Sequence, residues 1–151
     1  MRNINSVRRQ TYGNYEHIIV DDGNDPATAR IVQDFCDERL ILLTHKMPRG
    51  AAASYNSGIK KSRGEFITFL DDDDEYLPEF LEKMDRQYRI APSDIGFIWS
   101  GIERVCDLEN GQEQILRKFI WPAVFSDPES GLALATSIGN GFGVCVRKKC
   151  I

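Results

Sequence analysis

The stretch that decides the fold is EFITFLDDDDEYLP, residues 65–78. Residues 66–70 form a short apolar run rich in β-forming side chains, which is typical of a strand buried on both faces. We therefore expect residues 66–70 to be a central strand of a parallel sheet. The run ends abruptly in five adjacent carboxylates, residues 71–75. Adjacent carboxylates repel one another unless solvent or cations compensate their charge, so this segment is either an acidic surface turn or a cation site.

A second predicted strand, residues 15–20, also ends in carboxylates, those of Asp21 and Asp22. The carboxyl ends of parallel strands lie at one edge of a sheet, and ligands of open α/β sheets bind just outside that edge. Two acid clusters at the same edge favour a ligand site over a surface turn. Divalent hard cations prefer oxygen ligands and often share them with substrate phosphates.

Strands and helices alternate along most of the chain. Helices are predicted at residues 2–10, 25–38, 51–62 and 78–90, and strands at residues 15–20, 40–44, 66–70, 95–100, 113–120 and 141–146. The alternation over residues 15–100 predicts an α/β fold with parallel strands, helices on both faces and right-handed crossovers.

Composition narrows the class of protein. A chain of 151 residues fits one domain with a real core. The net charge of −4 argues against a general nucleic-acid binder. No signal peptide and no apolar run of about 18 residues is visible. The four cysteines lack zinc-site spacing and are expected to be reduced thiols, and His17 and His45 are interpreted as structural.

Three motifs carry a resemblance to a known family. VDDGN at residues 20–24, PRGAAASYNSGI at 48–59 and GEFITFLDDDDEYLP at 64–78 resemble the family 2 glycosyltransferases. The resemblance covers residues 2–105, and more weakly GFGVCVRKK at 141–149. It implies the GT-A fold of nucleotide-diphospho-sugar transferases, with a Rossmann-like, mostly parallel sheet between helices, and makes residues 1–151 a single, partial domain.

The resemblance also implies residues that bind the nucleotide. Asp22, with Asp21 beside it, matches the acid that recognises the nucleotide base, and Arg49 falls in the loop near the nucleotide and diphosphate. The sequence itself agrees for Arg49, because Arg49-Gly50 precedes a predicted helix, and free N–H groups at a helix N-terminus favour phosphate. The alternative for Arg49 is a solvent-exposed loop arginine.

Asp71, Asp72 and Asp73 match the DxD motif of the family. By the resemblance, Asp71 and Asp72 face the ribose, and Asp73, with Asp71, is the metal ligand. Asp71 and Asp73 would point to one side of the chain if this segment stays extended. We expect Asp74 and Glu75 to lie further out or in solvent.

The activity implied is transfer of a sugar, with inversion, from a UDP- or GDP-sugar to an acceptor hydroxyl group, with Mg²⁺ or Mn²⁺ as cofactor. The acceptor is a glycan, a lipid-linked molecule or another hydroxyl compound, and nucleic acid is not expected as a partner. The expected location is the cytoplasm. Peripheral association with the inner face of the membrane and a homodimer stay open.

The sequence departs from the family pattern at both ends. The family begins with a strand that this chain lacks before residue 2, which would leave unpaired edges inside the sheet. The catalytic base of the family is expected beyond Ile151, so no base is named here, and Tyr55 stands where relatives often carry a basic residue. We expect poor turnover by this chain alone. Two alternatives stay open: a non-catalytic nucleotide-sugar-binding fragment and a sugar-nucleotide nucleotidyltransferase.

Overall fold

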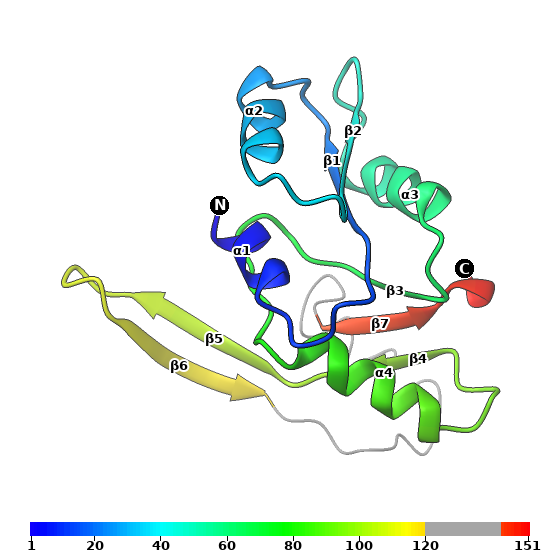
Figure 1. Cartoon of the computed structure of the whole chain (residues 1–151). Coiled ribbons are helices and arrows are strands. Elements are labelled where there is room, and N and C mark those ends of the chain that lie inside the picture. The colour runs from blue at the N-terminus through cyan, green and yellow to red at the C-terminus, as the bar shows by residue number, and fades with distance from the viewer. Residues whose placement is uncertain (120–142) are drawn as a thin grey trace.

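The structure is a computed structural model that describes residues 1–119 and 143–151. Figure 1 shows its elements in order. They are α1 (Arg2–Arg8), β1 (His17–Asp21), α2 (Pro26–Asp34), β2 (Leu40–Thr44), α3 (Ala51–Lys61), β3 (Phe66–Thr68), α4 (Phe80–Ile90), β4 (Phe97–Trp99), β5 (Ile102–Asp107), β6 (Glu113–Phe119), β7 (Val144–Arg147) and the short 3₁₀ helix η1 (Lys148–Cys150). The predicted alternation of strands and helices up to residue 100 is confirmed.

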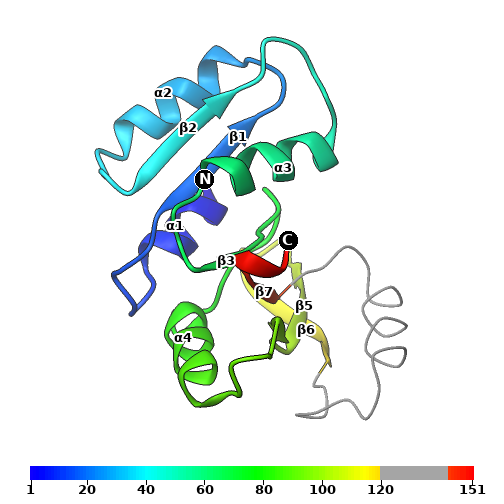
Figure 2. The same cartoon turned by 90° about the vertical axis from the view of Figure 1, so that its right-hand side faces the viewer.

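The first half of the chain forms the predicted parallel unit. β1 pairs with β2 in parallel, and α2 and α3 lie on opposite sides of this pair (Figures 1 and 2). The predicted start of α2 is confirmed, since the Asp25 side chain accepts a hydrogen bond of 2.9 Å from the Ala27 N–H and Pro26 occupies the first turn. This unit places the ends of β1 and β2 beside the start of α3.

The expected position of residues 66–70 needs correction. β3 is not a central parallel strand: it lies at the edge of a three-stranded sheet with the order β3-β7-β4, and both β3 and β4 are antiparallel to β7. The strand also ends at Thr68, because the carbonyl of Phe69 accepts a hydrogen bond of 2.6 Å from the hydroxyl of Tyr76. An apolar run predicts burial but does not specify which strand will pair with it.

The core lies between α4 and this antiparallel sheet. Phe80, Met84 and Tyr88 recur at helical spacing, form the buried face of α4 and pack against Cys145 of β7. The Tyr88 hydroxyl donates a hydrogen bond of 2.6 Å to the carbonyl of Cys145, and its ring stacks on Phe66 at 4.0 Å. Burial raises the pKa of the Cys145 thiol to about 12.

Within the described residues, β1 and β3 each have an unpaired edge that borders a cavity. In the described ranges, β1 pairs only with β2 and β3 pairs only with β7. A cavity of about 1050 Å³ separates β1 from β3, and its lining includes residues 18–20 of β1 and residues 66–70. The cavity extends to Tyr55 and Asp71.

The remaining strands form a hairpin. β5 and β6 pair in an antiparallel arrangement and project from the body of the molecule (Figure 1). Arg2 of α1 ties this hairpin to the acidic turn, since its guanidinium forms ion pairs with Glu75 at 2.6 Å and with Asp107 at 2.7 Å. Across the two described ranges, none of the helices combines the length and the apolar character that crossing a bilayer requires.

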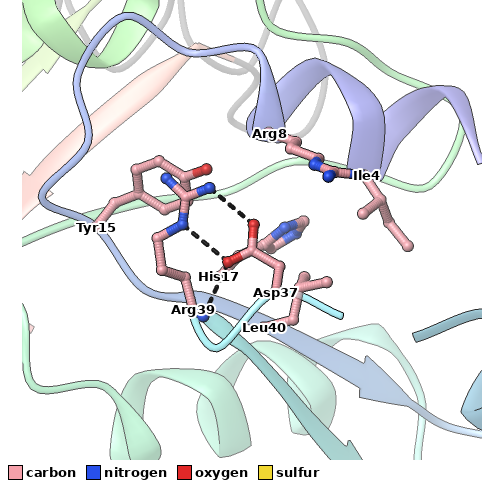
Figure 3. Close-up of a pocket in the computed structure, with 7 residues that line it drawn as sticks. All are labelled: Ile4, Arg8, Tyr15, His17, Asp37, Arg39 and Leu40. Carbon is pink, nitrogen blue, oxygen red and sulfur yellow. Dashed lines mark hydrogen bonds and ion pairs between the residues drawn. The ribbon is translucent and has the colours of Figure 1, made fainter. Parts of the chain in front are cut away.

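A closed polar cluster lies at the amino end of β1, away from the acid clusters (Figure 3). Arg39 binds the Asp37 carboxylate through Nε at 2.9 Å and through a terminal nitrogen at 2.7 Å, and stands 4.4 Å from the centre of the Tyr15 ring. The hydrogen bonds from Arg39 lower the pKa of Asp37 to about 2. Burial lowers the pKa of His17 to about 4, which agrees with its predicted structural role.

Substituting Tyr88 tests how much the α4 face stabilises the fold. We expect Tyr88→Ala to lower the free energy of unfolding by about 3–5 kcal/mol, since it empties a buried site. Tyr88→Phe removes only the hydroxyl group, and we expect a loss of about 1 kcal/mol. Urea denaturation followed by circular dichroism measures both. Ile90→Ala on the same helix is the control, because Ile90 is 72% exposed, and a loss as large as that of Tyr88→Ala would contradict the prediction.

His17 makes stability depend on pH. Its pKa is lower in the folded chain than in the unfolded chain, so the unfolded chain binds more protons between about pH 4 and about pH 6.5. The contribution of neutral His17 is complete above about pH 6.5, and about 3 kcal/mol of it is lost as the pH falls to about 4. We expect His17→Gln to lose correspondingly less stability than wild type over this range in urea titrations. Equal losses in both proteins would contradict this assignment.

Candidate functional site

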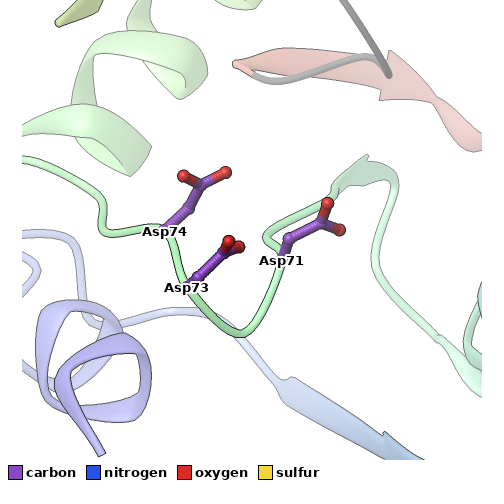
Figure 4. A group of neighbouring side chains, drawn as sticks. All are labelled: Asp71, Asp73 and Asp74. Carbon is purple, nitrogen blue, oxygen red and sulfur yellow. The ribbon is translucent and has the colours of Figure 1, made fainter. Parts of the chain in front are cut away.

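The acidic segment after β3 folds into a turn. The N–H of Asp74 donates to the carbonyl of Asp71 at 3.2 Å, and the side-chain amide of Asn3 in α1 donates to the same carbonyl at 2.5 Å. The turn gathers carboxylate oxygens of Asp71, Asp73 and Asp74 within 4.8 Å of one another (Figure 4). The prediction that Asp71 and Asp73 point to one side assumed an extended segment, but the segment forms a turn. The turn adds Asp74 to the group.

The negative charges of the carboxylates in this turn lie close enough to affect one another. Burial raises the pKa of Asp74, and the charges of Asp73, Asp71 and Asp72 raise it further. A group that gathers several carboxylates at a half-buried position is stabilised by a hard divalent cation, which prefers oxygen donors. The residues present therefore fit Mg²⁺ or Mn²⁺, and Asp72 is exposed and lies outside the group of three.

Tyr55 of α3 contacts the acidic turn. Its hydroxyl donates a hydrogen bond to the carboxylate of Asp71, and its ring packs edge-on against Phe69 at 5.3 Å. This hydrogen bond is the main cause that raises the pKa of Tyr55 to about 12, and burial adds to it. The position where relatives often carry a basic residue thus supplies a neutral donor that fixes Asp71.

Asp22 lies at the start of α3. Its carboxylate accepts hydrogen bonds from the backbone N–H of Arg49 at 2.9 and 3.0 Å and from that of Gly50 at 2.6 Å. His45 Nδ1 lies 2.6 Å from the same carboxylate. These contacts, that of His45 above all, lower the pKa of Asp22.

The backbone around Arg49 therefore differs from the prediction. The N–H groups of Arg49 and Gly50 are not free for a phosphate, since both donate to Asp22. Gly50 is the N-cap of α3, with a φ of 87° and no side-chain cap, so the positive end of the helix attracts the nearest carboxylate. The Arg49 side chain is exposed, as its position in the loop suggests.

Asp21 shares its edge of the sheet with Asp22. The Asp21 carboxylate accepts a hydrogen bond of 3.0 Å from the N–H of Gly23, which closes a tight turn directly after β1. Its backbone carbonyl accepts the N–H of His45 at 2.9 Å, so the pairing of β1 and β2 continues past the strand ends.

One helix connects the two acid clusters. Asp22 contacts the start of α3 at Gly50, whereas Asp71 contacts Tyr55, five residues further along. A helix rises 1.5 Å per residue, so the two contacts lie roughly 8 Å apart along its axis. The acids that follow two different strands thus contact the same helix.

Sequence reasoning missed His45 and Ser57. His45 Nε2 lies 2.9 Å from Ser57 Oγ, so the imidazole joins Asp22 to α3. The parallel register that pairs Asp21 with Thr44 places the next residues, Asp22 and His45, side by side. Aligning the two predicted strands in parallel would therefore have placed His45 beside Asp22.

Carboxylates that follow two strands and contact one helix agree with the motifs by which the sequence resembles family 2 glycosyltransferases. The profile described as "Glycosyl transferase family 2" matches residues 2–116. The chain belongs to glycosyl transferase family 2, and its fold is the GT-A fold of that family.

Known relatives agree with this assignment. The UDP-Glc:alpha-D-GlcNAc-diphosphoundecaprenol beta-1,3-glucosyltransferase WfgD of Escherichia coli is 34% identical over 119 residues, 79% of this chain and 44% of WfgD. An uncharacterized glycosyltransferase of Haemophilus influenzae is 30% identical over 146 residues, 97% of this chain and 47% of the relative. Glycosyltransferase GlyG of Streptococcus pneumoniae is 33% identical over 94 residues, 61% of this chain and 31% of GlyG. The chain spans less than half the length of these relatives.

Substituting the acids one at a time tests the group of three. We expect Asp73→Asn to weaken Mn²⁺ binding roughly tenfold, because it removes a charged oxygen donor. Asp72→Asn is the matched control: it removes the same charge one residue away, and we expect a change below about threefold because Asp72 lies outside the group of three. Electron paramagnetic resonance of free Mn²⁺ measures both constants. Equal losses would mean that the turn attracts cations without binding one at a defined place.

Proposed function

We propose that this chain forms the donor-binding part of an inverting family 2 glycosyltransferase, which transfers a sugar from a nucleoside-diphosphate sugar to an acceptor hydroxyl group. The observation that carries the proposal is the convergence of Asp71, Asp73 and Asp74 at the end of β3. α3 links this group to the Asp22 cluster at the end of β1.

The acidic turn would hold the cation. Asp71 and Asp73 are the proposed ligands of Mg²⁺ or Mn²⁺, and the position of Asp74 makes it a third. A bound cation would neutralise the negative charge that develops on a diphosphate leaving group. Tyr55 fixes the Asp71 carboxylate by its hydrogen bond, and exposed Asp72 would face the ribose beside Asp71.

The Asp22 cluster would form the nucleotide side of the site. Asp21 and Asp22 lie at the end of β1, where the family resemblance puts the base, and Arg49 extends from the loop before α3. A guanidinium at this position suits the diphosphate, because its planar set of donors can hold phosphate oxygens.

The relatives favour one donor and one acceptor class. The name of WfgD specifies UDP-Glc and a diphosphoundecaprenol-linked acceptor, so we propose a UDP-sugar donor and a lipid-linked acceptor for this chain. Such an acceptor favours action in the cytoplasm at the inner face of the membrane. The family assignment also favours glycosyl transfer over nucleotidyl transfer, the other enzyme class left open by the sequence.

Titration calorimetry with UDP and GDP, with Mn²⁺ or with EDTA, tests the donor site. We expect UDP to bind in the presence of Mn²⁺ and to lose at least about tenfold in affinity when EDTA removes the cation, since the diphosphate and the carboxylates share it. Asp73→Asn should reproduce the effect of EDTA. Failure of both nucleotides to bind under either condition would overturn the proposed function.

Release of UDP from UDP-glucose, with and without a polyprenyl-diphosphate-linked sugar, then separates an enzyme from a binding module. Release that increases with the acceptor supports transfer. Binding without release supports the alternative of a non-catalytic nucleotide-sugar-binding fragment.

A further inference from the structure

Both oxygens of the Asp22 carboxylate accept hydrogen bonds from the protein. One oxygen accepts from His45 Nδ1 at 2.6 Å and from the Arg49 N–H at 2.9 Å. The other oxygen accepts from the Arg49 N–H at 3.0 Å and from the Gly50 N–H at 2.6 Å. The carboxylate thus accepts from three N–H groups, and the Arg49 N–H is shared between its two oxygens. Asp22 therefore fixes the backbone of the loop before α3 through its hydrogen bonds to Arg49 and Gly50.

His45 determines where this carboxylate lies. Its side chain is only 10% exposed, and both ring nitrogens have partners, Asp22 through Nδ1 and Ser57 through Nε2. In the neutral ring, an Nδ1–H group donates to the carboxylate and Nε2 accepts from the Ser57 hydroxyl. The His45 backbone is fixed too, because its N–H donates to the carbonyl of Asp21.

The resulting chain of hydrogen bonds spans four segments of the fold. It joins the end of β1 at Asp22, the end of β2 at His45, the loop at Arg49 and Gly50, and α3 at Ser57. Two of these contacts hold α3, one at its start and one two turns further along. A helix held at two points keeps both its position and its rotation about its own axis.

We propose that His45 is a positioning residue for donor binding, which orients the Asp22 carboxylate toward the backbone of Arg49 and Gly50. The inference rests on the proposed function and names the group that shapes its nucleotide side. His45 touches no reacting atom in this scheme. Through Asp22 it sets the loop from which Arg49 extends.

Two amide substitutions distinguish the hydrogen bond of Nδ1 to Asp22 from the hydrogen bond of Nε2 to Ser57. In His45→Asn, the shorter amide takes the place of Nδ1 and keeps a donor toward Asp22. In His45→Gln, the longer amide takes the place of Nε2 and keeps only the contact with Ser57. We expect His45→Ala and His45→Gln to weaken UDP binding in the presence of Mn²⁺ roughly tenfold, and His45→Asn to stay within about threefold of wild type.

Mn²⁺ alone serves as the internal control. In the part of the chain that the structure describes, the hydrogen-bond partners of the His45 ring are Asp22 and Ser57 and none lies in the acidic turn, so we expect all three variants to bind Mn²⁺ as wild type does. Nucleotide binding by His45→Asn that is as weak as that of His45→Ala would overturn the proposal. So would equal binding by all variants and wild type.

Amide hydrogen exchange followed by NMR tests the same geometry without a nucleotide. We expect faster exchange at the N–H groups of Arg49 and Gly50 in His45→Ala, restored protection in His45→Asn, and unchanged exchange in α4. Faster exchange throughout the domain would show a merely structural role and overturn the proposal. If the wild type binds neither UDP nor GDP, the proposed function fails, whereas exchange at these two amides still decides whether His45 positions the loop.

Discussion

Repulsion among carboxylates at the strand ends is the constraint on which this architecture depends. The fold compensates each acid differently. Backbone N–H groups and His45 bind Asp22, the Tyr55 hydroxyl binds Asp71, and Arg2 pairs with Glu75. In the described ranges Asp73 has no such hydrogen bond or ion pair, and the pKa of Asp74 is raised by burial and by its neighbours. A divalent cation would therefore reduce the repulsion most at Asp73 and Asp74, whose charges the protein does not compensate.

α3 gives these separate compensations a common frame. Its start is held by Asp22, its second turn carries Tyr55 to Asp71, and Ser57 binds the imidazole of His45. The large cavity between β1 and β3 lies beside this helix, so no hydrogen-bonded sheet connects the two acid clusters within the described residues. Their relative position depends instead on side-chain contacts to one helix.

Local signals in the sequence predicted much of this structure. The Asp25-Pro26 pair gives the start of α2, and the spacing of Phe80, Met84 and Tyr88 gives the buried face of α4. Both signals act within a few residues, where propensity and periodicity decide the outcome. The acids after two strands led to the prediction of one site, and the structure shows that Asp22 and Asp71 both contact α3. The sheet around β3 was not predictable in this way, because its partner β7 lies some 80 residues further along the chain. Asp74 joined the acidic group only because the segment turns.

Cys145 gives this fold a built-in chemical reporter. Its thiol is buried beneath α4, and the raised pKa keeps it protonated, whereas Cys36, Cys106 and Cys150 are exposed. Alkylating reagents react with the thiolate, so a brief treatment of the native protein should modify the three exposed cysteines and spare the fourth. Modification of Cys145 would then follow the detachment of α4 from β7. The kinetics of that reaction would measure how often the core opens, without any added label.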